Sequence, residues 1–207
     1  MVLLDEPLSN LDARLRQSMR SEIRRICKEH GLTGVYVTHD QEEALSMADR
    51  IALLREGQIQ QSGTPEMLYS RPNTRFTAEF LGETNLVDAT IHAAKGNGVE
   101  LDTPLGRLSS TALPTDLPEA GNVTCSIRPE SLRLIDQETS HSPAAAIVTG
   151  QVQERMFLGE RCRLTISCGD AATSLHVLEI GTEAEKTRQN ANVRMAIEPE
   201  DVVVLSD

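Results

Sequence analysis

The sequence predicts an α/β segment followed by an all-β domain. In the first part of the chain, short apolar runs alternate with helical patterns, as in sheets built from strand–helix–strand units. From Asn85 onward, short β-prone runs follow one another with turn residues between them, which is typical of a small barrel or sandwich. The pattern changes at 82–85, so we place the two domains at residues 1–82 and 83–207.

The composition is that of a globular protein and argues against two other classes. Apolar residues make up 39% of the chain and charged residues 25%. The net charge is −11, and there are two Tyr, three Phe and no Trp. Nucleic acid is therefore not an expected partner, because its binding needs positive charge and aromatic rings. No apolar run reaches the ~18–20 residues of a membrane span, so we expect the chain not to cross a membrane itself. The four cysteines lack zinc-site spacing and are expected to be reduced, buried thiols.

The first forty residues carry the strongest local pattern. Val2–Leu4 is all apolar and reads as a short buried strand, which Pro7 ends. Asn10 or Asp12 is placed to cap the next helix, whose apolar residues recur every three or four positions. Val35–Val37 is the second predicted strand. The sequence therefore predicts one strand–helix–strand unit here.

Caps and turn residues predict the remaining elements. Asp40 and Glu43 form a capping-box-like start for a short helix over Gln41–Ala48. The other elements expected before residue 85 are a hairpin of Ile51–Leu54 with Gln58–Ser62 and two short helices, Pro65–Ser70 and Thr74–Leu81. The strands expected after it are Leu86–His92, Gly98–Leu101, Gly106–Leu108, Val123–Arg128, Leu132–Ile135, Ala146–Gln153, Arg161–Ser167, Thr173–Glu179, Val193–Ile197 and Val202–Leu205. Loops are expected at 136–144 and, unless it forms a short polar helix, at 182–192.

Polar residues follow the two predicted parallel strands at what we expect to be one edge of a sheet. Asp5 and Glu6 end the first strand, and His39 follows the second. Ligands of open α/β sheets bind beyond the carboxyl ends of the strands, an arrangement that suits a magnesium nucleotide. There, one carboxylate holds Mg²⁺ directly or through water, a second polarises an attacking water, and a histidine contacts the transferred phosphate. Taken alone, the acidic pair is also consistent with an ordinary surface pair, and the histidine with a capping or core residue.

The order of these segments resembles the ATP-binding-cassette (ABC) ATPases. The stretches Leu3–Pro7, Ser9–Asp12 and Thr38–Asp40 resemble that family's Walker B strand, D-loop and switch-histidine region. The resemblance implies a partial P-loop NTPase sheet that uses ATP and Mg²⁺. It assigns Glu6 as catalytic base, His39 as the γ-phosphate contact and Asp5 as the carboxylate that associates with Mg²⁺ through water. The D-loop residues Ser9, Asn10 and Asp12 would bind the cofactor at the dimer interface.

The resemblance extends over nearly the whole chain. The segments 48–51, 57–65, 69–72 and 76–82 resemble the ATPase subunits of importers for maltose-type sugars, polyamines, ferric iron and phosphonates. The stretch Ser126–Glu130 resembles a recurring motif of their accessory TOBE domain, an OB-like β module, although it is also consistent with a purely structural strand end. The implied fold is α/β with a partial P-loop NTPase sheet, followed by an all-β OB-like (TOBE) barrel. The implied partners are permease subunits and a second copy of the chain, at the cytoplasmic face of the membrane.

Two motifs that this family needs for catalysis do not occur in the sequence. There is no G-x-x-x-x-G-K-[ST] phosphate loop and no signature motif. We therefore expect the chain to be the C-terminal part of a longer ATPase and not to hydrolyse ATP by itself. The partial sheet would have an unpaired edge, so we expect residues 1–82 to be rearranged, dimerised or swapped. The alternative hypothesis is a regulatory, dimerisation or ligand-sensing module without ATPase activity.

Overall fold

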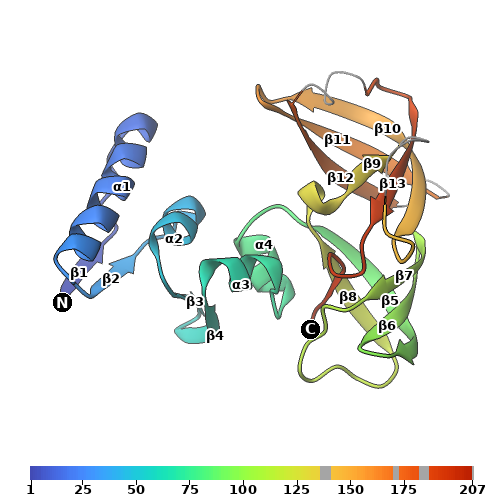
Figure 1. Cartoon of the computed structure of the whole chain (residues 1–207), viewed down its shortest axis with the longest axis horizontal. Coiled ribbons are helices and arrows are strands. Elements are labelled where there is room, and N and C mark those ends of the chain that lie inside the picture. Colours follow the sequence, from blue (N-terminus) through green and yellow to red (C-terminus); the bar gives the residue numbers. More distant parts are fainter. Residues whose placement is uncertain (136–140, 170–172, 182–186, 207) are drawn as a thin grey trace. The chain divides into compact units, whose positions relative to one another are not determined.

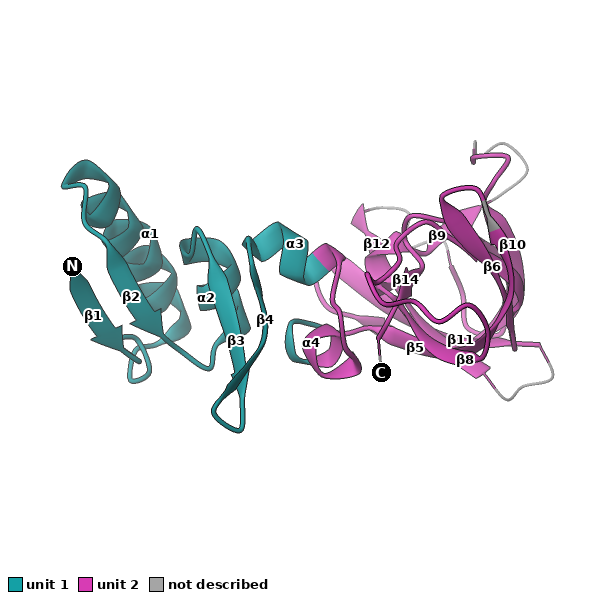
Figure 2. Ribbon diagram, turned by 90° about the horizontal axis from the view of Figure 1, so that it is seen from below, with its two compact units in different colours: residues 1–69, 80–82 teal, residues 70–79, 83–207 magenta. Residues whose placement is uncertain are grey.

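The computed structural model describes residues 1–135, 141–169, 173–181 and 187–206 (Figure 1). The chain forms two compact units (Figure 2). The first unit comprises residues 1–69 and 80–82, and the second comprises 70–79 and the chain from 83 onward. Each unit is described here by itself.

The first unit contains a small parallel sheet, flanking helices and a hairpin. In chain order its elements are β1 (Val2–Asp5), α1 (Ala13–Glu29), β2 (Gly34–Val37), α2 (Gln41–Met47), β3 (Ile51–Arg55), β4 (Gln58–Gly63) and α3 (Pro65–Ser70). Strands β1 and β2 are parallel, with Val2 opposite Gly34 and Asp5 opposite Val37. Both strands therefore end at the same edge of the sheet.

Helix α1 forms as the sequence predicts but buries little. Its N-terminus is capped by Asp12, whose carboxylate accepts a hydrogen bond of 3.0 Å from the Leu15 amide. It packs near β2, since a Cβ added to Gly34 would lie 3.8 Å from the sulfur of Cys27. No residue of α1 is fully buried. Two strands offer too little surface to cover a helix of this length.

The apolar side chains of the parallel sheet are also open to solvent. Leu3 of β1 is 68% exposed, and Val35 and Val37 of β2 are exposed as well. Rearrangement was one of the expected ways to cover the sheet edge. In the structure of the single chain, β1 and β2 keep the predicted parallel pairing, so this sheet is not rearranged.

The second unit is built from helix α4 and two five-stranded sheets. The sheets have the strand orders β14-β8-β5-β6-β7 and β12-β11-β10-β13-β9, and neighbouring strands are antiparallel. The bounds are α4 (Arg75–Phe80), β5 (Asn85–Lys95), β6 (Gly98–Thr103), β7 (Gly106–Ser110), β8 (Asn122–Ile127), β9 (Arg133–Ile135), β10 (Ala146–Phe157), β11 (Arg161–Cys168), β12 (Thr173–Ile180), β13 (Asn192–Ile197) and β14 (Val203–Val204), with a 3₁₀ turn at Pro129–Ser131. Every expected strand forms, although β10 runs four residues beyond its predicted end. Parts of the loops expected at 136–144 and 182–192 lie outside the described residues.

The two sheets of the second unit share one hydrophobic core. Along β11, inward residues alternate with half-buried ones, so Cys162, Leu164 and Ile166 are fully buried. They pack in the same cluster as Leu101 of the other sheet. The four cysteines are free thiols; Cys125, Cys162 and Cys168 are buried as expected, whereas Cys27 is only half-buried. Burial raises the pKa of the Cys125 thiol to about 12.

Arg128, in the stretch that resembles the TOBE motif, has a structural role. Its side chain is buried and donates hydrogen bonds to the carbonyl oxygens of Ala78 (2.9 Å) and Glu83 (3.1 Å). The next residue, Pro129, is buried and starts the 3₁₀ turn. Arg128 thereby fixes the segment that leads into β5, as the structural interpretation of this motif predicts.

Asn85 links the two sheets. It is buried at the start of β5, and its side-chain amide donates to the carbonyl oxygens of Ile127 (3.2 Å) and His176 (2.8 Å). Its side-chain oxygen accepts a 2.7 Å bond from the His176 amide on β12. One buried side chain therefore satisfies three backbone groups of both sheets.

We expect Asn85→Ala to lower the free energy of unfolding of the second unit by roughly 2 kcal/mol, because it leaves buried backbone groups without partners. Urea unfolding followed by far-UV circular dichroism measures the loss. The matched control is Asn122→Ala, which removes an exposed asparagine bonded to Thr90 and should cost less than about 0.5 kcal/mol. Equal losses in both variants would show that the link contributes nothing special.

Candidate functional site

The parallel pairing of β1 and β2 brings Glu6 and His39 together. Asp5 lies opposite Val37 at the end of the two strands, and the Glu6 amide donates to the Val37 carbonyl oxygen at 2.9 Å. His39 follows two residues after Val37. As a result, Oε1 of Glu6 and Nδ1 of His39 are 2.9 Å apart. These residues are separated by most of the first strand–helix–strand unit in sequence, yet they form a direct pair.

The backbone at Glu6 is in an unusual conformation. Its φ angle is 42°, in the left-handed region that non-glycine residues rarely adopt. The residue opens a tight turn, in which its carbonyl oxygen accepts the Ser9 amide at 3.2 Å and Leu8 is buried. Such strain persists only where surrounding contacts enforce it, and it concentrates at functional sites.

The pair is open to solvent and electrostatically coupled. The side chain of His39 is 74% exposed and that of Glu6 is 45% exposed. The hydrogen bond and the negative charge of Glu6 raise the pKa of His39 above its ordinary value of 6.5, with smaller contributions from Asp40 and Glu43. The charged pair is therefore complete below pH 6.5 and is lost as the pH rises through the elevated pKa.

The other residues predicted for the site lie beside the pair. Asp5 is exposed at the end of β1, next to Glu6. Ser9 and Asn10 are exposed on the following turn, and Asp12 uses its carboxylate to cap α1. Among the described residues, no three His, Cys, Asp or Glu side chains gather as metal ligands. A single carboxylate such as Asp5 can associate with Mg²⁺ only where water and phosphate supply the other ligands.

The sequence alone did not predict the ion pairs made by a row of four basic residues on α1. These residues recur every four positions and therefore share one face of the helix. They face acidic groups in and after the His39 turn: Arg16 with Asp40 at 3.3 Å, Arg20 with Asp40 at 3.1 Å, Arg24 with Asp49 at 3.5 Å and Lys28 with Asp49 at 2.9 Å. This spacing, set against the acidic start of α2, is the sequence signal that would have revealed the contact.

Glu43 is the buried centre of this polar cluster. Its side chain is 4% exposed and accepts hydrogen bonds from the hydroxyls of Tyr36 (2.9 Å) and Thr38 (2.8 Å). Its amide donates to the Asp40 carboxylate at 3.1 Å, as the predicted capping box requires. Desolvation, followed by the bond to Glu43, raises the pKa of Tyr36, so that its hydroxyl remains a donor. The residues on both sides of His39 are thus held by hydrogen bonds.

Comparison with known proteins shows which family the chain resembles. Residues 125–205 match the TOBE domain family. The spermidine/putrescine import ATP-binding protein PotA of Pseudomonas fluorescens is 39% identical over 89% of this chain and 51% of its own length. The chain matches the C-terminal part of ABC importer ATP-binding subunits, including their TOBE domain. The PotA protein of Rubrobacter xylanophilus is 35% identical over 99% of the chain and 53% of its own length. The sn-glycerol-3-phosphate import protein UgpC of Chromohalobacter salexigens is 50% identical over 70% of the chain and 37% of its own length.

The comparisons confirm the family and the fold class that the sequence predicted. The chain spans about half the length of the curated relatives it matches. A solved structure of the cytoplasmic molybdate-binding protein ModG aligns with a TM-score of 0.50 and 16% identity, over 59% of this chain and 96% of that one. That likeness supports the OB-like fold of the β sheets. No helix in the described part of the chain is long and apolar enough to span a bilayer.

We expect the pKa of His39 to lie above 6.5 and to fall in Glu6→Gln, because the neutral amide provides no anionic partner. NMR titration of the imidazole ring measures both values. The exposed Glu42→Gln on α2 is the matched control and should leave the His39 pKa unchanged. A His39 pKa that does not respond to Glu6→Gln would show that the pair does not form in solution.

Proposed function

We propose that residues 1–82 are the C-terminal portion of the ATP-hydrolysing domain of an ABC importer. The observation that carries this proposal is the 2.9 Å pair between Glu6 and His39 at the shared edge of β1 and β2. A base and a phosphate contact must both reach the terminal phosphate of one nucleotide. The sheet edge places the two side chains close enough to do so.

In this proposal Glu6 acts on water and His39 on phosphate. The Glu6 carboxylate accepts a proton from the water that attacks the γ-phosphate, while the His39 ring donates a hydrogen bond to a γ-phosphate oxygen. In the structure the His39 ring is hydrogen-bonded to the Glu6 carboxylate itself. Binding of ATP would therefore replace the pair with separate bonds to water and phosphate.

The cofactor assignment follows from the neighbouring carboxylate. Asp5 would hold Mg²⁺ through water, and the ion would neutralise charge on the phosphate oxygens. Ser9, Asn10 and Asp12 would form the turn that meets the second copy of the subunit. This turn is exposed apart from half-buried Leu11, which leaves its polar side chains accessible to such a partner.

The proposal extends to the partners and to the second domain. The chain would act with integral-membrane permease subunits and a second copy of itself, peripherally on the cytoplasmic face of the membrane. The names of the relatives, import ATP-binding proteins, support this assignment. Residues 83–207 would form the TOBE regulatory domain, with the boundary near Gly82.

We also propose that these 207 residues do not hydrolyse ATP unaided. In P-loop enzymes the phosphate cradle consists of backbone amides and a lysine in a glycine-rich loop, and this sequence has no such motif. The Glu6–His39 pair and Asp5 provide the base, the phosphate contact and the metal carboxylate. They provide no equivalent of the cradle.

The test is Mg²⁺-dependent phosphate release by the chain alone and by a chimera that carries the N-terminal half of the Pseudomonas fluorescens PotA before Met1. We expect turnover only from the chimera. Glu6→Gln should lower its kcat by about 100-fold or more, because the general base is lost.

Glu29→Gln, at the far end of α1, is the control and should retain activity. Turnover by the chain alone that disappears in Glu6→Gln would contradict the proposed inactivity. An active chimera that tolerates Glu6→Gln would contradict the role of Glu6.

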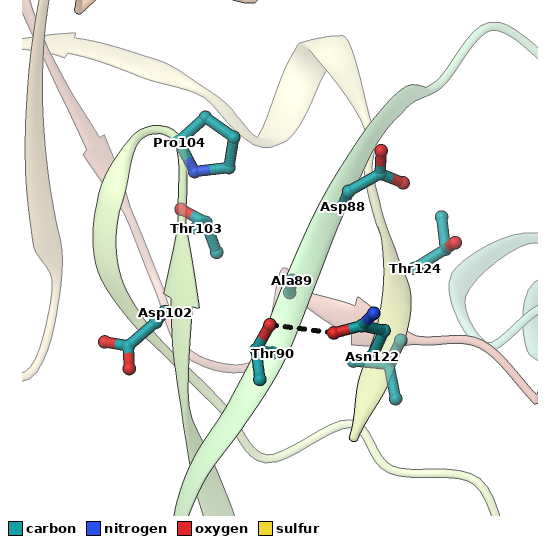
Figure 3. Close-up of a pocket in the computed structure, with 9 residues that line it drawn as sticks. Asp88, Ala89, Thr90, Asp102, Thr103, Pro104, Asn122 and Thr124 are labelled. Carbon is teal, nitrogen blue, oxygen red and sulfur yellow. Dashed lines mark hydrogen bonds between the residues drawn. The ribbon is translucent and has the colours of Figure 1, made fainter.

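A groove in the second unit favours a second candidate function, ligand sensing. It has a volume of about 480 Å³ and lies on strands β5, β6 and β8 (Figure 3). Asp88 and Asp102 line it together with Thr90 and Asn122, which are hydrogen-bonded to each other at 3.0 Å. Asp102 is already paired with Arg107 at 3.1 Å and with His92 at 3.0 Å. The Asp88 carboxylate disfavours an oxyanion such as the molybdate named for ModG and favours a cation or a hydroxylated molecule.

Calorimetric titration of the chain with Mg-ATP, putrescine and molybdate separates the two functions. Binding of putrescine that is weakened by Asp88→Asn, without ATP binding, would favour the sensing module. Glu119→Gln, an exposed carboxylate outside the groove, is the control. Binding of molybdate but not putrescine would contradict the electrostatic argument.

A further inference from the structure

The guanidinium of Arg16 contacts three separate segments of the first unit. Its Nη2 donates to the carbonyl oxygen of Leu11 at 3.1 Å, and its Nη1 donates to the Asp40 carboxylate at 3.3 Å. Its Nε lies 3.9 Å from a carboxylate oxygen of Glu43. Each nitrogen of the group therefore faces a different partner.

Two of these segments are the turns that border the Glu6–His39 pair. Leu11 belongs to the turn 9–12 that follows β1, and Asp40 directly follows His39. A guanidinium is planar and rigid, and its nitrogens keep fixed positions relative to one another. A displacement of the carbonyl at one nitrogen therefore moves the carboxylate at another. Lysine, with a single ammonium on a flexible stem, could not link them in this way.

The turn around His39 is stiff enough to pass such a displacement on. The Asp40 amide donates to the Thr38 hydroxyl oxygen at 2.9 Å, and that hydroxyl donates to Glu43 at 2.8 Å. Arg20 holds the same Asp40 oxygen at 3.1 Å. His39 lies between Thr38 and Asp40, and these bonds hold both neighbours in defined positions. A shift of Asp40 therefore changes the orientation of the His39 ring toward Glu6.

Charge neutralisation alone does not distinguish Arg16 from Arg20. The two arginines face three carboxylates, Asp40, Glu42 and the buried Glu43. Arg20 contacts all three, including the two that Arg16 contacts. Unlike Arg20, Arg16 also donates a hydrogen bond to the backbone of the turn 9–12.

We propose that Arg16 is a positioning residue that couples the turn 9–12 to His39. The consequence of this coupling for catalysis rests on the proposed function. A partner that contacts the turn 9–12 would alter the alignment of His39, the proposed phosphate contact. The coupling itself is a property of this chain without nucleotide. It can therefore be tested independently of ATP hydrolysis.

The experiment is an NMR titration of the ¹⁵N-labelled chain that follows the His39 ring and the amides of the turn 9–12. In the unsubstituted chain we expect these amides to shift with the His39 titration. In Arg16→Lys, which keeps the charge, and in Arg16→Gln, the amplitude of that response should fall at least about threefold, because neither side chain forms the fork. The exposed Arg14→Gln is the matched control and should retain the full response.

The direction of the His39 pKa separates positioning from charge. The acidic groups that face this ring are Glu6, Asp40 and Glu43. Simple removal of the Arg16 cation leaves these carboxylates less neutralised and would raise the His39 pKa. Loss of alignment with Glu6 would lower it. We expect it to fall in both variants, with the far-UV circular dichroism unchanged.

Two results would overturn the proposal. A response of the turn that survives in both Arg16 variants would assign the coupling to the direct bond between the Ser9 amide and the Glu6 carbonyl oxygen, which both variants keep. A His39 pKa that rises in Arg16→Gln and stays constant in Arg16→Lys would reduce Arg16 to a charge. If Arg16→Gln unfolds the first unit, the response of the turn and the His39 pKa in Arg16→Lys decide between the two roles. An inactive chimera with an intact Arg16 coupling would contradict the proposed function and leave this inference standing.

Discussion

The parallel register of β1 and β2 is the constraint on which the candidate site depends. Because Asp5 lies opposite Val37, the residues that leave the two strands start from the same edge. A shift of register by one residue would turn each side chain to the other face of the sheet. The 2.9 Å approach of Glu6 to His39 therefore follows from backbone pairing, and the left-handed turn at Glu6 completes it.

Next to this edge, hydrogen bonds and ion pairs around Glu43, rather than a hydrophobic core, hold the surrounding elements together. Glu43 is nearly as buried as a core leucine, which is costly for a carboxylate unless hydrogen bonds and opposite charges compensate. Tyr36 and Thr38 provide the hydrogen bonds, and Arg16 and Arg20 the charges. These partners come from β2, from the turn after it and from α1. The cluster therefore fixes three elements relative to one another, in the place where His39 must be oriented.

The sequence predicted the fold and the placement of Glu6 and His39 at one sheet edge because both follow from regular patterns. Alternation with a period of two predicted β11, and the carboxyl ends of two apolar runs predicted that Glu6 and His39 lie together. The sequence did not predict the burial of Glu43 or the triple contact of Arg16. Charged residues are usually exposed. Burial of one of them requires partners that neutralise or hydrogen-bond it, and these can lie up to 27 positions away in the sequence, as Arg16 does from Glu43. For the same reason the sequence did not predict the role of Asn85, which lies just before the expected strand Leu86–His92 and joins two sheets through His176.

The two units also differ in what stabilises them. The second has a continuous apolar core that draws on both sheets, whereas the first leaves the apolar faces of β1 and β2 open and buries no residue of α1 completely. Local opening is governed by how many apolar contacts must be broken, so the first unit should open before the second. Its ion pairs respond unequally to salt, since screening acts on exposed charges such as Lys28–Asp49 far more than on those around Glu43. The alignment of His39 therefore depends on the inner, least screened part of the cluster, and this is the part that Arg16 connects to the turn 9–12.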